Sequence, residues 1–179
     1  MRQLQSLLAS GECVWIIGEN YPPVPELALK EILPCLQMVL PEEVAPPAST
    51  MEIVELSSAD AAEMVALTTL AFPGFFRSRT CEMGTYFGVR SDGELIAMSG
   101  ERLMLDGYPE ISGVCTHPAH RGKGLAASLI WRLVEKHRRE GLVSWLHVAV
   151  ENHRAIELYL RMGFKVSRKI TANRISRRD

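Results

Sequence analysis

The chain has 179 residues, of which 47% are hydrophobic and 23% charged, as expected for one α/β domain with a modest extension. This composition excludes a wholly disordered chain, and no apolar run approaches the roughly 18–20 residues that a membrane helix needs. The net charge is −1, but residues 117–179 carry 14 of the 20 Lys and Arg residues and only 5 of the 21 acidic residues. This cationic part would either bind a polyanionic ligand or simply form solvated helix faces and a basic tail.

Four cysteines are widely spaced, and none belongs to a Cys-x-x-Cys pair. The spacing predicts reduced, mostly buried thiols and no metal site. Residues 1–18 make a poor signal peptide, because Gln5, Ser6, Gly11 and Glu12 interrupt the apolar stretch. We therefore expect a cytoplasmic protein.

Residues 1–49 predict an N-terminal extension or partial domain. A short strand is expected over residues 12–18, while residues 26–40 have helical spacing that Pro34 should break or kink. Three prolines within the next eight residues indicate a linker. We place a domain boundary there, which leaves residues 50–179 as the main domain.

The main domain begins with a strand over residues 51–56 and a helix that ends near Leu70. A loop with Phe72, Phe75 and Phe76 follows. These aromatic side chains would either close the core or line the mouth of a substrate site.

Strand patterns and then helical patterns follow in chain order. The Asp92-Gly93 pair is a strong hairpin signal, so the strands around it should be antiparallel. Asn152 is suited to cap the last helix, and Gly163 to end it in the left-handed conformation. The expected elements are strands at 84–90, 94–105 and 110–116, a helix at 125–137, a strand at 143–150, a helix at 152–162 and a strand at 164–170. A strand–helix–strand crossover beside an antiparallel meander predicts an α/β fold with a mixed sheet.

The turn before the long helix contains the chemically most informative residues. Gly122 and Gly124 let the backbone approach a ligand closely, and the free N–H groups of the first helical turn point at one spot. Arg121 and Lys123 add positive charge. The segment therefore suits a pyrophosphate, although a Gly-x-Gly before a helix is also common in ordinary tight turns. It is not a Walker loop, because Gly follows the lysine.

Two segments of this part of the chain resemble signatures of the GNAT superfamily of N-acetyltransferases. Residues 121–126 (RGKGLA) match Arg/Gln-x-x-Gly-x-Gly/Ala. Residues 152–164 (NHRAIELYLRMGF) match Asn-x-x-Ala-x-x-Leu-Tyr-x-x-x-Gly-Phe. They are about 30 residues apart in the family's order, and the resemblance covers roughly residues 51–170. Residues 79–118 are also similar to a subgroup near the glycine N-acyltransferase-like enzymes.

The resemblance implies a mostly antiparallel sheet with flanking helices that splays apart between the fourth and fifth core strands, where the pantetheine arm of acetyl-CoA binds. It implies that Val114 and Thr116 offer main-chain groups to this cosubstrate, and that Cys115 between them belongs to the same binding site. The pyrophosphate would bind to Arg121, Gly122, Lys123, Gly124, Leu125 and Ala126. Asn152 would face the pantetheine arm, and Tyr159 would point its hydroxyl at the thioester sulfur.

Acetyl transfer to an amine also needs a neutral nucleophile, a donor for the oxyanion and a proton for the departing thiolate. Tyr159 is the catalytic candidate for the last role, or else a packed tyrosine. For the general base, His147 comes first because an imidazole titrates near neutrality, followed by Glu110 and then Glu101. No protein base at all is a further alternative.

The sequence thus predicts an acyl-CoA-dependent N-acetyltransferase that acts on a primary amine, in a small molecule or amino acid, in a ternary complex. The alternative is a non-catalytic acyl-CoA-binding regulatory domain. We expect acetyl-CoA as cosubstrate, no metal, no nucleic-acid partner and no membrane partner. Residues 1–49 would be either the remnant of a larger N-terminal half or the contact of a homodimer.

Overall fold

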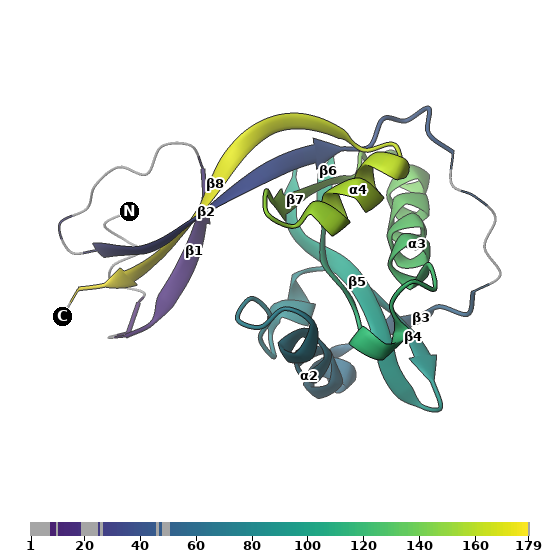
Figure 1. Cartoon of the computed structure of the whole chain (residues 1–179), viewed down its shortest axis with the longest axis horizontal. Helices are drawn as coiled ribbons and strands as arrows, with labels where there is room; N and C mark the ends of the chain where they lie inside the picture. The colour runs from purple at the N-terminus through teal and green to yellow at the C-terminus, as the bar shows by residue number, and fades with distance from the viewer. Residues whose placement is uncertain are drawn as a thin grey trace.

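The structure, a computed structural model, describes residues 8–9, 11–18, 25, 27–45, 47 and 51–178. These residues are built around one sheet with the strand order β1-β8-β2-β7-β6-β5-β4-β3 (Figure 1). The strands are β1 (Cys13–Ile17), β2 (Leu27–Val39), β3 (Val54–Leu56), β4 (Tyr86–Ser91), β5 (Glu94–Leu105), β6 (Tyr108–Thr116), β7 (Trp145–Ala149) and β8 (Lys165–Arg177).

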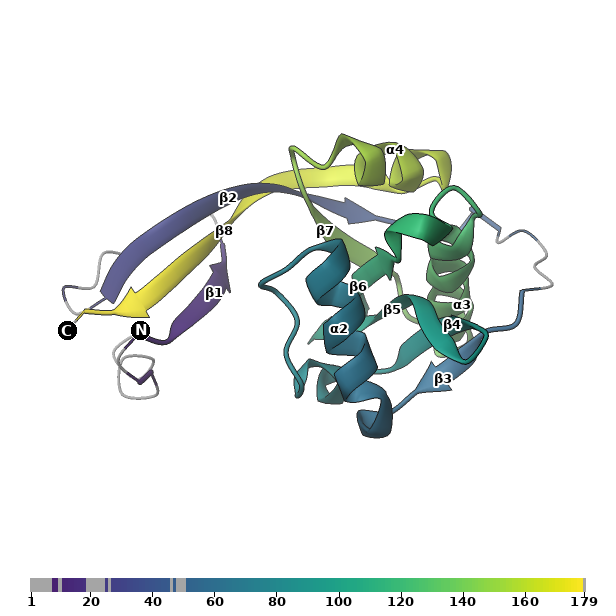
Figure 2. The ribbon, with the colours of Figure 1, turned by 60° about the horizontal axis from the view of Figure 1, so that its bottom comes forward.

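Helices cover both faces of one half of the sheet. They are α2 (Ala61–Ala71), α3 (Leu125–Arg139) and α4 (His153–Arg161), with short 3-10 turns at Ser58–Asp60, Thr80–Met83 and Pro118–His120. The helix α2 packs on one face through Met64 and Leu67, and α3 packs on the other face through Leu129, Ile130 and other buried residues. Figure 2 shows α2 on one side of β5 and β6, with α3 and α4 on the opposite side.

The predicted meander is confirmed, because β3, β4, β5 and β6 pair with their neighbours in antiparallel fashion. The helix α3 then crosses over to β7, which runs parallel to β6. This pairing is short: Glu110 pairs with Trp145 and Ile111 with Leu146, and no further pair follows. The two strands therefore separate, as expected for the mostly antiparallel, splayed α/β sheet.

The other half of the sheet is a three-stranded arm. The strand β2 pairs with both β7 and β8, and β1 pairs with the outer end of β8. Figures 1 and 2 show the outer halves of β2 and β8, together with β1, extending away from the helices. The strand β8 continues well past residue 170, where the sequence suggested its end, because β1 and β2 provide hydrogen-bonding partners along its whole length.

The helix expected over residues 26–40 is wrong: residues Leu27–Val39 form β2, and Glu26 lies outside the described residues. Pro34 explains the outcome. A proline inside a helix costs about 3 kcal/mol, whereas in a strand it removes one ladder hydrogen bond. Here its carbonyl still accepts from the N–H of Val150 at 3.0 Å. Strand pairing on both sides then outweighs the helical spacing of the apolar residues.

The proposed linker joins two strands of the same sheet. It lies between β2 and β3, and residues 46 and 48–50 of it are outside the described part of the chain. The division into an extension over residues 1–49 and a domain over residues 50–179 stays a prediction.

Candidate active site

Just beyond the last pair of β6 with β7, Gly113 has a φ of 63°, and the pairing of β6 with β5 shifts register. This left-handed conformation favours glycine. Beyond the last pair with β7, β6 continues as Val114, Cys115 and Thr116 without a partner strand on that side. The carbonyl of Thr116 accepts from Nε of Arg121 at 3.4 Å. The N–H of His117 bonds to the carbonyl of Ile96 on β5. By the alternation of a strand, the main-chain groups of Cys115 therefore also face β5, while those of Val114 and Thr116 face the gap between β6 and β7.

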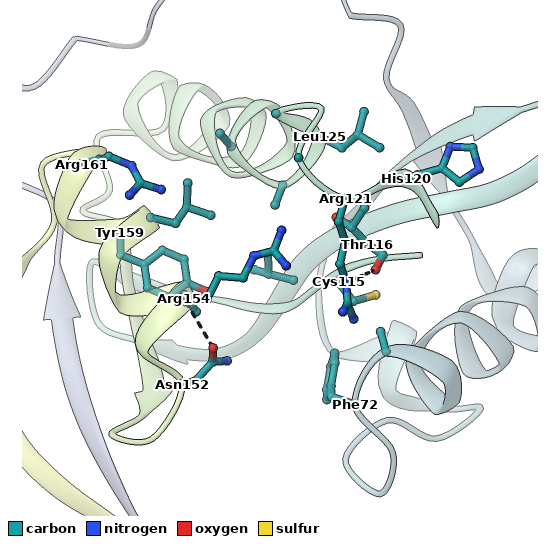
Figure 3. A pocket seen from close by; sticks show the side chains of 18 residues that line it. Phe72, Cys115, Thr116, His120, Arg121, Leu125, Asn152, Arg154, Tyr159 and Arg161 are labelled. Carbon is teal, nitrogen blue, oxygen red and sulfur yellow. Dashed lines mark hydrogen bonds between the residues drawn. The ribbon is translucent and has the colours of Figure 1, made fainter. Parts of the chain in front are cut away.

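A cavity of about 540 Å³ lies in this gap (Figure 3). It is lined by residues from the end of α2, from β6, from the turn before α3 and from α4. Of the residues expected to bind the cosubstrate, it includes Val114, Cys115, Thr116, Arg121, Gly122, Gly124, Leu125, Ala126 and Asn152. Lys123 is exposed and does not line the cavity.

The turn before α3 is shaped for close contact with a ligand. Gly122 and Gly124 have φ values of 80° and 77°, and nothing lies within 4 Å of where a Cβ would stand on either residue. The first backbone bond of α3 runs from the N–H of Ser128 to the carbonyl of Gly124 at 3.1 Å. The preceding N–H groups therefore have no acceptor within the helix and, together with the helix dipole, favour an anion.

Three arginines add positive charge to the cavity: Arg121 from the turn, and Arg154 and Arg161 from α4. No carboxylate side chain is found among the lining residues of the described chain. In Figure 3, Arg154 extends between Tyr159 and the wall that holds Arg121. We did not identify Arg154 and Arg161 from the sequence, although they lie on the same stretch of α4 as the signature residue Tyr159. His120 and Phe72 also line the cavity.

The helix α4 presents the two other signature residues. The Oδ1 atom of Asn152 accepts from the N–H of Ala155 at 3.2 Å, which confirms the expected cap, and Asn152 also lines the cavity. Tyr159 lines the same cavity but is only 6% exposed. Burial raises its pKa to about 12, so the hydroxyl stays protonated and can act as a proton donor.

His147 and Glu110 do not line this cavity, but the structure brings them together. The Nδ1 atom of His147 lies 2.8 Å from Oε1 of Glu110. The side chain of Arg102 donates to the same carboxylate from Nε at 3.0 Å and from Nη2 at 2.7 Å. We did not single out Arg102 from the sequence.

The Glu110 carboxyl is only 1% exposed. Burial disfavours its charged form, but the hydrogen bonds from His147 and Arg102 outweigh this effect and hold its pKa below the usual value. An ionised carboxylate only accepts, so Nδ1 of His147 is the donor of the pair, and in the neutral imidazole Nε2 carries the lone pair. Nε2 is buried and has no partner among the described residues.

Glu101, the third candidate base, is hydrogen-bonded to other groups of the protein. Its carboxylate accepts from Thr85 N–H at 2.9 Å and from Lys136 Nζ at 3.0 Å, and lies 2.9 Å from His137 Nε2. Burial opposes ionisation, but these hydrogen bonds lower the pKa of Glu101 to about 2. A carboxylate held on three sides is a weak base and is poorly placed to take a proton from a substrate.

The described residues contain no group of three or more His, Cys, Asp and Glu side chains that could hold a metal ion. The four cysteines are free thiols. Within the same residues, no helix is long and apolar enough to cross a membrane.

Comparison with known proteins agrees with this geometry. The family model described as Acetyltransferase (GNAT) family matches residues 53–164. A structure from Novosphingobium aromaticivorans assigned to the GNAT family is 36% identical with a TM-score of 0.90, and the match covers 98% of this chain and 80% of that one. The ribosomal-protein-S18-alanine N-acetyltransferase from Escherichia coli is 19% identical with a TM-score of 0.58, over 70% of this chain and 92% of that one, which shows a shared fold alone.

A curated relative from Salmonella typhimurium, L-methionine sulfoximine/L-methionine sulfone acetyltransferase, is 34% identical over 87 residues. The match spans about half of each chain, 48% of this one and 48% of the relative. Together with the cavity at the splay and the two signature segments that line it, the match over residues 53–164 shows that this chain belongs to the acetyltransferase (GNAT) family.

Proposed function

We propose that this acetyltransferase moves the acetyl group of acetyl-CoA directly to a primary amine of a small molecule or amino acid, in a ternary complex. The observation that carries this proposal is the cavity in which the glycine turn, three arginines and Tyr159 meet at the splay. A regulatory domain that only binds acyl-CoA would not need the Tyr159 hydroxyl there.

The residues around the cavity fit acetyl-CoA. The open space above Gly122 and Gly124, the free N–H groups at the start of α3 and the side chain of Arg121 suit the pyrophosphate. Arg154 and Arg161 suit the remaining phosphate charge. The main-chain groups of Val114 and Thr116 on the gap side suit the amides of the pantetheine arm, and the N–H of Val114 is the candidate donor to the oxyanion.

Proton transfer would use His147 and Tyr159. A neutral amine attacks the thioester carbonyl carbon, the C–N bond forms, and Nε2 of His147 takes one N–H proton. As the C–S bond breaks, the Tyr159 hydroxyl gives its proton to the departing thiolate. A proton then passes from His147 to Tyr159 through solvent, which restores both groups. Glu110 would hold the His147 ring in the required tautomer.

Two similarities bear on the class of the acceptor. The Salmonella typhimurium relative acetylates amino-acid derivatives, and the similarity to the glycine N-acyltransferase-like subgroup favours the same class. Both support an amino acid or related amine as acceptor. The cytoplasmic location and the homodimer stay predictions.

A screen for release of free CoA tests this function. Acetyl-CoA is incubated with a panel that includes glycine, L-methionine sulfone, polyamines, aminoglycosides and benzylamine. We expect amine-dependent release of CoA with at least one primary amine, and an N-acetylated product by mass spectrometry. Acetyl-CoA binding without release for any amine would instead favour a binding domain.

A further inference from the structure

Among the described residues, four buried polar side-chain atoms have no hydrogen-bond partner: Tyr86 Oη, Ser99 Oγ, His147 Nε2 and Ser176 Oγ. Such atoms are rare in native proteins and need an explanation, such as a ligand. Ser176 lies on the arm. Ser99 alternates along β5 with Met98, which packs on the α2 side, so Ser99 faces the α3 side. Tyr86 and His147 remain, and both lie near the splay.

The ring of Tyr86 is held in one position by its neighbours. Tyr86 pairs with Gly100 on β5, and a Cβ on Gly100 would stand 2.2 Å from its ring. Phe76 packs edge-on against the ring, with centroids 5.6 Å apart. A Cβ on Gly113 would lie 3.1 Å from Cε1 and 3.8 Å from Oη of Tyr86. The ring therefore lies across β5, and its hydroxyl reaches β6 at Gly113.

This hydroxyl and His147 approach the same place from opposite sides. The pairing of β6 and β7 ends at Ile111 and Leu146. His147 directly follows Leu146, and Gly113 comes two residues after Ile111, one on each side of the gap. The residue after Gly113 is Val114, which lines the cosubstrate cavity. Tyr86 Oη and His147 Nε2 therefore flank the stretch of β6 that leads into the cosubstrate cavity.

We infer that the Tyr86 hydroxyl and His147 Nε2 together form the binding site of the acceptor nitrogen, and that this site selects primary amines. The inference rests on the proposed function. A neutral primary amine has one lone pair and two N–H groups. With the lone pair directed at the thioester carbon, one N–H can bond to Nε2 and the other to Oη. A secondary amine would leave one of these buried acceptors unpaired and would press its alkyl group against it.

Tyr86 is suited to this task because it stays neutral. Burial raises its pKa, so the hydroxyl remains protonated and its oxygen lone pairs can accept from the amine. It thereby positions the nitrogen, whereas the proton itself goes to His147.

The test compares primary amines with their N-methyl derivatives in the wild type and in Tyr86→Phe. The probes are glycine and sarcosine, L-methionine sulfone and its N-methyl derivative, and benzylamine and N-methylbenzylamine. For the pair that reacts, we expect the wild type to favour the primary amine by at least about 10²-fold in kcat/KM. Tyr86→Phe should narrow this ratio by about tenfold or more, through a slower reaction of the primary amine. Tyr108→Phe, which changes an exposed tyrosine on β6, is the matched control and should keep the ratio.

Two further measurements separate this role from a structural one. The Tm of Tyr86→Phe should equal or exceed that of the wild type, because the hydroxyl has no partner in the protein. Its affinity for acetyl-CoA should not change. If primary amines react but Tyr86→Phe keeps the wild-type ratio of kcat/KM between the primary and the N-methyl amine, this inference is wrong and the proposed function stands. The same holds if Tyr86→Phe lowers kcat/KM equally for both amines of a pair and also lowers the Tm. If no amine reacts at all, the proposed function fails and the inference fails with it.

Discussion

The Oε1 atom of Glu110 lies 2.8 Å from Nδ1 of His147, although the two residues are 37 positions apart in the sequence. They meet because Glu110 pairs with Trp145 across the short parallel contact of β6 and β7, which places β7 beside it. The two residues that the sequence offers as alternative candidates for the general base thus form one hydrogen-bonded pair. Arg102 keeps the carboxylate charged, so the pair has a defined polarity.

The first prediction concerns this pair. His147→Gln retains hydrogen-bonding ability but cannot take up a proton near pH 7. Its kcat/KM should fall by roughly 10²–10⁴-fold at neutral pH and recover partly at high pH, where a larger share of the amine is neutral. Glu110→Gln should lose less, because it keeps the base but no longer fixes the tautomer. The measurement is the pH profile of kcat/KM for both variants.

The control for this prediction is His153→Gln at the exposed start of α4, which should keep the wild-type profile. The reverse pattern, an unchanged His147→Gln and an inactive but folded Glu110→Gln, would make Glu110 the base. Unchanged profiles in both variants would mean that the amine loses its proton without a protein base.

The second prediction concerns Tyr159. Tyr159→Phe keeps the buried ring and removes the proton donor, so kcat should fall by about 10²–10⁴-fold. The affinity for acetyl-CoA, measured by calorimetry, should barely change. Chemistry must limit the rate for this comparison, which single-turnover kinetics can establish. An unchanged single-turnover rate would exclude Tyr159 from the mechanism.

The third prediction concerns the pyrophosphate. Gly124→Glu places a side chain and a negative charge at the start of α3 and should abolish acetyl-CoA binding. Part of any effect is backbone strain, since a non-glycine residue at positive φ costs of order 1–2 kcal/mol. Gly93→Glu is the matched control, because Gly93 has a φ of 84° and open space but lies in a hairpin turn outside the cavity. Equal affinities of the two folded variants in calorimetry would place the phosphates elsewhere.

The fourth prediction concerns stability at low pH. The pKa of Glu101 is about 2, below the usual 4.5 of a glutamate, so its contribution to stability is present above pH 4.5 and is lost as the pH falls toward 2. Glu101→Gln has no such titration. Between pH 6 and pH 3, the stability difference between the wild type and Glu101→Gln should narrow by roughly 2 kcal/mol. Urea unfolding at the two pH values measures it, and a constant difference would contradict the assignment.

The sequence by itself determined the main domain to a large extent. The apolar spacing of residues 125–137, the Asp92-Gly93 turn and the capping Asn152 are local signals, and the structure confirms the helix, the hairpin and the cap that they predict. The residues of the two GNAT signatures were also readable, because a glycine turn before a helix start is a local device for holding an anion.

Only the tertiary structure determined that residues 27–39 belong to the arm and that the polar residues beside the cavity lie together. Residues 27–39 form a strand because β7 and β8 lie on either side of them, and no local pattern reveals partners more than 100 residues away. Likewise, Arg102, Glu110 and His147 belong to three strands, and Tyr86 to a fourth. Their roles depend on which backbones are neighbours and on where β6 leaves β7. The residue types in a sequence suggest candidate acids and bases. Burial and hydrogen-bonding partners, which depend on strand pairing, determine which candidate takes each role.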